Sequence, residues 1–136
     1  MIGWDDIAEG LELAPLVKPP IDRMQLVKYA GASSDFNRIH YDDQFAREGG
    51  YPGVFAHGML IMGCLGQLVS DFAGGPRGLV KLRCRFRAIT WPGDVITCHG
   101  RVTRKDAAAR TIELALQAVN QEGNPVADGA ATVRVE

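Results

Sequence analysis

The spacing of apolar residues divides the chain into a helical first half and a strand-forming second half. From His57 to about Phe72, apolar residues occupy almost every angle of a helical wheel, which predicts a helix buried on all sides. Beyond it, apolar and polar residues alternate, as in half-buried antiparallel strands. The four predicted strands are Leu79–Ile89, a run through Ile96 and Val102, a run from Ile112 to Ala118, and a run ending at Val133 and Val135.

Before the long helix, the sequence predicts a helix over residues 23–32 with a clear start. Asp22 is a good N-cap residue, and Gln25 three positions later completes a capping-box pattern. Ile21 and Leu26 stand where a hydrophobic staple would pack. Leu11, Leu13 and Leu16–Val17 suggest a short strand before this helix, and a second short helix is expected to begin after Asp42 and to end at Gly49–Gly50.

Within the long helix, Met59, Gly63, Gly66 and Ser70 form one row, where another backbone could approach closely. A sheet that curls around a single central helix buries both with few other elements. We therefore predict an α+β chain, residues 1–136, that forms one domain with an antiparallel sheet wrapped around a long central helix.

Composition narrows the function classes. The net charge is −1 with no block of like charges, which gives no electrostatic support for a nucleic-acid or membrane-surface role. Three widely spaced cysteines and the lack of a membrane-length apolar run or a signal-peptide pattern favour a cytoplasmic, soluble protein. Arg83, Arg85 and Arg87 form a basic strip that is either a solvated sheet face, a dimer contact or a phosphate contact.

Asp35, Asn37 and His40 bring an acid, an amide and an imidazole together within six residues. Asp and His can act as a general acid/base pair, because histidine titrates near neutral pH and a poorly hydrated pocket raises the pKa of an aspartate. Spacing alone favours a simpler interpretation, in which Asp35 and Asn37 shape a turn and His40 closes the loop, because such triplets are common in loops.

His57 and Gly58 stand at the start of the long helix. Backbone N–H groups at a helix N-terminus are unpaired and partly positive, so they could bind a carbonyl oxygen and stabilise an enolate-like intermediate. Gly58 would allow a substrate to approach this backbone closely. The alternative is that Gly58 only forms a tight turn and His57 is an ordinary residue at a helix start.

Together these residues resemble the MaoC-like (R)-specific enoyl-thioester hydratases and dehydratases. The resemblance lies in YAGASSDFNRIH from Tyr29 to His40, in Ala46, and in AHGM from Ala56 to Met59, and extends over nearly the whole chain. The family pattern is an aromatic and a small residue, then G-D-x-N-P-hydrophobic-H and a later A-H-G. The resemblance implies a single hot-dog domain.

The resemblance also implies roles. Asp35 and His40 would be the catalytic pair, holding the water that adds to C3 of a trans-2-enoyl thioester and delivering the proton at C2, or running the reverse dehydration of a (3R)-3-hydroxyacyl thioester. The Gly58 N–H would polarise the thioester carbonyl, and Asn37 would support the loop. No metal and no cofactor are expected beyond the coenzyme A or acyl carrier protein that carries the substrate. A homodimer or higher oligomer is expected, and a heterodimer is an alternative.

Two departures from the pattern stand beside the pair. Ser34 replaces the family's glycine, which strains the chain if that position needs a positive φ. Arg38 replaces its proline and could act on Asp35, reach a carrier phosphate or stay solvated. The alternative functions are a thioesterase of the same fold and a subunit of a hetero-oligomer that needs a partner.

Overall fold

The computed structural model describes residues 3–135 and contains one five-stranded antiparallel sheet in the order β1-β3-β4-β5-β2. The α-helices are α1 (Arg23–Ser33), α2 (Asp43–Glu48) and α3 (Gly58–Phe72). The strands are β1 (Leu16–Val17), β2 (Leu79–Phe86), β3 (Thr97–Asp106), β4 (Thr111–Val119) and β5 (Pro125–Arg134). Short 3-10 turns lie at η1 (Trp4–Asp6), η2 (Arg38–His40) and η3 (Pro76–Gly78).

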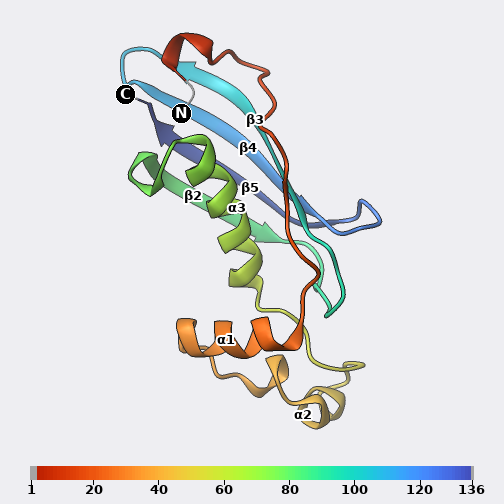
Figure 1. Ribbon diagram of the computed structural model, residues 1–136. Coiled ribbons are helices and arrows are strands. Elements are labelled where there is room, and N and C mark those ends of the chain that lie inside the picture. The colour runs from red at the N-terminus through yellow and green to blue at the C-terminus, as the bar shows by residue number, and fades with distance from the viewer. Residues whose placement is uncertain (1–2, 136) are drawn as a thin grey trace.

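Helix α3 crosses one face of the sheet, and α1 and α2 lie together beyond one end of it (Figure 1). The main core is formed by the buried side of α3, including Leu65 and Val69, against inward residues of the strands such as Val102, Leu114 and Val133. The predicted sheet wrapped around a long central helix is confirmed.

The prediction that α3 is buried on all sides is wrong. Its residues at 59, 63, 67 and 71 are exposed, and the side chain of Met59 is 56% accessible. The physical reason is that the sheet covers only one side of the helix within residues 3–135. Only part of the predicted row of small residues packs against the sheet. A Cβ at Gly66 would meet Leu82 of β2 at 3.4 Å, whereas a Cβ at Gly63 would point into open space.

Strand β2 is shorter and less regular than the predicted run Leu79–Ile89. A register shift between Leu79 and Lys81 turns Val80 outward, although alternation placed it on the buried face. The strand ends at Phe86, and the segment that follows leaves the sheet. Among the described residues, β2 pairs only with β5, so it forms one edge of the sheet.

A second, smaller core lies under α1 and α2. It consists of Ile21, Leu26, Ala46, Val54 and Ala56. Both helices start as the sequence indicates: Asp22 Oδ1 accepts the N–H of Gln25 at 2.7 Å, and Asp42 Oδ1 accepts the N–H of Phe45 at 3.1 Å. The chain passes from this small core into the main core at the start of α3. Across residues 3–135, no helix has the length and apolar content that crossing a membrane requires.

Candidate active site between the two cores

The loop that carries Asp35 begins with a strained residue. Helix α1 ends at Ser33, and its C-cap Ser34 has φ 60° and ψ 18°, in the left-handed region. The sequence prediction that Ser34 replaces a glycine at a strained position is consistent with this backbone. The N–H of Asp35 then donates to Ser33 Oγ at 3.2 Å, which turns the chain away from the helix axis.

Asp35 and Asn37 both shape the turn. Asp35 Oδ1 accepts the N–H of Asn37 at 3.2 Å, and Asn37 Oδ1 accepts the N–H of Ile39, also at 3.2 Å. Asp35 and Asn37 therefore do form the turn, as the simpler interpretation expected. This uses only Oδ1 of Asp35, so its second carboxylate oxygen, Oδ2, is free to face His40. The Asp35 side chain is 52% exposed, so the poorly hydrated surroundings expected for it are missing in the single chain.

His40 is held rigidly at the end of η2. It is 8% exposed, and its Nδ1 lies 2.7 Å from the carbonyl oxygen of Phe55. A carbonyl can only accept, so the proton of the neutral ring is assigned to Nδ1 and the lone pair to Nε2. His40 Nε2 lies 4.0 Å from Asp35 Oδ2. The basic nitrogen of the ring is thus turned toward the carboxylate.

His57, the N-cap residue of α3, packs beneath this pair. It is 2% exposed, its ring stacks on that of His40 with centroids 3.7 Å apart and an interplanar angle of 24°, and Tyr29 of α1 packs edge-on at 4.8 Å. His57 Nε2 lies 3.2 Å from the backbone oxygen of Asp35. Burial lowers the pKa of His57, the hydrogen bond with the Asp35 backbone opposes this, and the neighbouring His40 lowers it further.

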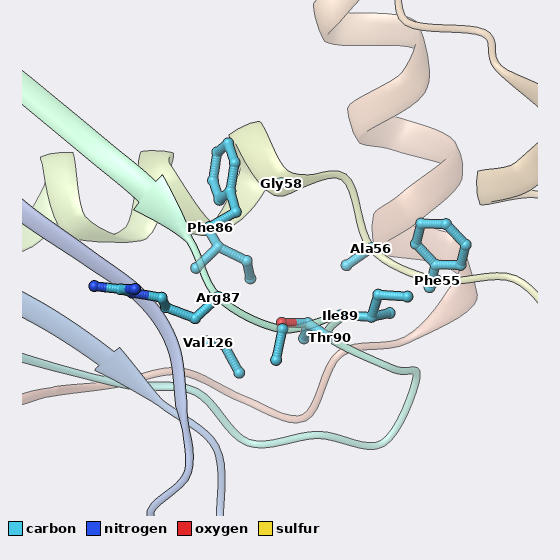
Figure 2. Close-up of a pocket in the computed structure, with 10 residues that line it drawn as sticks. Phe55, Ala56, Gly58, Phe86, Arg87, Ile89, Thr90 and Val126 are labelled. Atoms are coloured by element: carbon cyan, nitrogen blue, oxygen red, sulfur yellow. The ribbon is translucent and has the colours of Figure 1, made fainter.

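Gly58, the first residue of α3, borders an apolar cavity of about 310 Å³. Figure 2 shows the lining, which comes from Phe55, Ala56, Gly58 and Ile61, from the segment Phe86–Thr90 and from Val126. The Phe86 ring lies over Gly58, where a Cβ would come within 3.2 Å of three ring atoms. Phe55 connects the two parts of the site, because its carbonyl binds His40 and its side chain lines the cavity.

Arg38 does not act on Asp35 in this structure. Its guanidinium binds Asp42 Oδ2 at 2.7 Å and lies over the ring of Phe45 at 4.8 Å from the centroid. The hydrogen bond from Arg38 holds the pKa of Asp42 below its usual value. The sequence left three roles open for Arg38: acting on Asp35, reaching a carrier phosphate or staying solvated. In the structure Arg38 stays partly solvated and forms an ion pair with Asp42 in its own turn.

Ligand atoms of Asp35, His40 and His57 all lie within 4.8 Å of one another, which raises the question of a metal ion. The Nε2 of His57 is already hydrogen-bonded to the backbone oxygen of Asp35, and the Nδ1 of His40 to that of Phe55. This donor set suits proton transfer better than tetrahedral coordination. The absence of a metal stays a prediction.

The structure brings together all five residues that the sequence singled out: Asp35, Asn37, His40, His57 and Gly58. Sequence reasoning missed Phe55 and Phe86. Phe55 acts through its carbonyl, which carries no side-chain signal. Phe86 was expected on the buried face of its strand, but it is 48% exposed and reaches across to α3.

Comparison with known proteins gives consistent matches. The family model "MaoC like domain" matches residues 10–124. An (R)-specific enoyl-CoA hydratase from Rhodospirillum rubrum is 30% identical over 97% of this chain and 90% of that protein. A solved MaoC-like dehydratase superposes with a TM-score of 0.91 at 30% identity, covering 98% of this chain and 42% of that one. The unliganded R-hydratase PhaJ1 from Pseudomonas aeruginosa superposes with a TM-score of 0.89 at 25% identity, covering 99% and 87%. These matches confirm the hot-dog fold.

Replacing Ser34 with glycine is expected to stabilise the protein by about 0.5–1 kcal/mol. A left-handed residue with a Cβ costs roughly 1–2 kcal/mol, and the greater flexibility of glycine in the unfolded chain offsets part of the gain. Urea unfolding of Ser34→Gly measures this difference. Ser33→Gly is the matched control and should lose stability, because it removes the hydroxyl that contacts Tyr29 O and Asp35 N. Equal losses in both variants would contradict strain at Ser34.

Proposed function

The chain belongs to the MaoC-like domain family, and on that premise we propose that this hydro-lyase adds water to trans-2-enoyl thioesters with (R) stereochemistry, or removes it from (3R)-3-hydroxyacyl thioesters. One observation carries the proposal: Asp35 and His40 face each other beside the N-terminus of α3, next to an apolar cavity. The 30% identity to an (R)-specific enoyl-CoA hydratase supports the reaction and its stereochemistry.

The distance between Asp35 and His40 suits a bound water. Their facing atoms are 4.0 Å apart, too far for a direct hydrogen bond. If a water oxygen lay about 2.8 Å from both atoms, the angle between the two contacts at that oxygen would be about 90°. The water could therefore donate one hydrogen bond to each acceptor. Such a water directs a lone pair outward toward C3 of the substrate. The pair accepts the proton that the water loses and returns a proton to C2.

The start of α3 would bind the thioester oxygen. His57 provides no side-chain cap, so the first N–H groups of the helix remain directed outward at Gly58. As water adds to C3, the electrons of the double bond move onto the thioester oxygen and form an enolate. The Gly58 N–H and the partial positive charge of the helix end would stabilise this negative charge. Asn37 keeps the role of holding the Asp35 turn.

The acyl chain would enter the cavity beside Gly58. The walls are mainly apolar, and a volume of about 310 Å³ lies at the small end of ligand pockets, roughly 300–1,000 Å³. Short to medium acyl chains fit this space. The coenzyme A or acyl carrier protein that holds the thioester would remain outside, and no further cofactor is needed.

We also propose that two copies pair through the free edge of β2. The edge strand has unpaired backbone groups, and the neighbouring surface holds the exposed apolar side chains of Met59, Val80 and Phe86. An edge of this kind favours pairing with another strand. Pairing would join the two sheets and cover the exposed side of α3.

The catalytic pair is tested by Asp35→Asn and His40→Gln. Each change should lower kcat/KM for hydration of crotonyl-CoA by about 10²–10⁴-fold, because each removes one proton acceptor from the bound water. Loss of enoyl absorbance measures the rate, and chiral chromatography identifies the product. Asp5→Asn and His99→Gln, both exposed and outside the site, are matched controls and should retain full activity.

Three outcomes would overturn the proposed reaction: an (S) product, an undiminished rate in Asp35→Asn, or release of free thiol without hydration. The last would identify a thioesterase.

Phe86→Ala tests the position of the acyl chain. Removing the ring should enlarge the cavity at Gly58 and raise the kcat/KM ratio of octenoyl-CoA to crotonyl-CoA by about tenfold. Phe72→Ala, which removes the same ring from the other end of α3, is the control for general loosening. An unchanged ratio in Phe86→Ala, with activity retained, would place the acyl chain elsewhere.

Pairing through β2 predicts a particle of twice the chain mass in light scattering. Met59→Lys should shift it to a single chain, because the change places charges in the apolar contact. Val17→Lys alters an exposed valine on β1 at the opposite edge of the sheet and should leave the dimer intact. Dissociation by Val17→Lys alone would assign the contact to the other edge.

A further inference from the structure

The side chain of His57 contacts both members of the proposed catalytic pair, although it stands at the start of a helix where its backbone was expected to matter. Its imidazole does not cap α3. It is turned instead under the loop, between Tyr29 on one side and His40 on the other. At 2% exposure, the ring has almost no surface that a substrate could contact.

The first contact holds the backbone of Asp35. Because a carbonyl oxygen only accepts, the Nε2 of His57 is the protonated nitrogen, and it donates to Asp35 O at 3.2 Å. Asp35 directly follows the left-handed Ser34. A residue with a Cβ in that conformation disfavours the turn, so the loop needs an anchor outside itself. The hydrogen bond from His57 provides one from the start of α3.

The second contact fixes the plane of the His40 ring. The bond from Nδ1 to Phe55 O alone would allow the ring to swing about that hydrogen bond. The face of His57, 3.7 Å away and nearly parallel, prevents this rotation. The Nε2 of His40 is thereby directed at Asp35 Oδ2.

The ring can do this only in its neutral form. The titratable groups that face it are Tyr29 from α1, Asp35 from the loop and His40 from η2. Burial lowers the pKa of His57, and the neighbouring His40 lowers it further, so the charged form of His57 is disfavoured. Its Nδ1 has no hydrogen-bond partner within residues 3–135, so a proton there would be a buried donor without an acceptor.

We propose that His57 is a positioning residue that sets the distance between Asp35 and His40 by holding the backbone of one and the ring plane of the other. This inference rests on the proposed hydratase function and goes further, because it assigns the buried imidazole to the geometry of the pair and not to contact with substrate. His57 exchanges no proton with the substrate in this role.

Two variants separate the two contacts. His57→Gln keeps a donor for Asp35 O and removes the stacked ring, whereas His57→Phe keeps a ring and removes the donor. Each should lower kcat for crotonyl-CoA by about 100-fold, the effect of misplacing a catalytic group by about 1 Å. KM should change much less, because binding of substrate is untouched. His99→Gln is the control and should match the unmodified protein.

A double-variant cycle distinguishes positioning from general damage. Combined with Asp35→Asn, His57→Phe should cost little further activity, because the pair it serves is already disabled. Additive losses would overturn the proposal, as would a raised KM with kcat unchanged or full activity in both single variants.

Nitrogen-15 spectra of the histidine rings test the same point without substrate. In the unmodified protein, His40 should carry its proton on Nδ1 and His57 on Nε2. In His57→Gln, the His40 ring signals should broaden through motion, while His57→Phe should keep them sharp. The opposite tautomers, or identical His40 signals in both variants, would overturn the positioning role. If these spectra agree with expectation but no enoyl thioester is hydrated, the proposed function fails and the positioning inference stands.

Discussion

The start of α3 at the boundary between two apolar cores is the constraint on which the site depends. Leu65 and the rest of the buried side of the helix pack against the sheet, whereas Val54 and Ala56 just before it belong to the small core under α1 and α2. Both attachments fix where the helix begins. Its first N–H groups, the ring of His57 and the apolar cavity are consequently held in one place, and the Asp35 loop is built against them.

Polar groups at this boundary are held mainly by backbone carbonyls. His40 donates to Phe55 O and His57 donates to Asp35 O, so each ring has a defined tautomer without a charged partner. Fixed in this way, His40 retains the lone pair of its Nε2 for proton transfer. Arg38, the nearest cation in the loop, is bound by Asp42. The local charges therefore leave the Asp35 carboxylate available to a water molecule, which is what a hydration reaction needs.

The single chain leaves the site open on one side. Asp35 is half-exposed, Met59 points outward from α3, and β2 has a free edge. These features leave the site more exposed to solvent than is usual for an active site, where exclusion of water strengthens electrostatic interactions. A second copy along β2 would cover apolar surface and lie close to the cavity under Phe86.

The sequence by itself determined the fold class and the helix starts at Asp22 and Asp42, because periodicity and capping are short-range signals. It also singled out Asp35, Asn37, His40, His57 and Gly58 as candidate site residues, because they form a dense local motif. It could not show that α3 is exposed along Met59 and Gly63, because an apolar residue has the same identity whether a sheet or a second chain covers it. Only the tertiary structure decided that Val80 turns outward at a bulge, that Phe86 reaches Gly58, and that His57 stacks on His40. Those contacts join segments far apart in the chain, and their geometry depends on how the two cores meet.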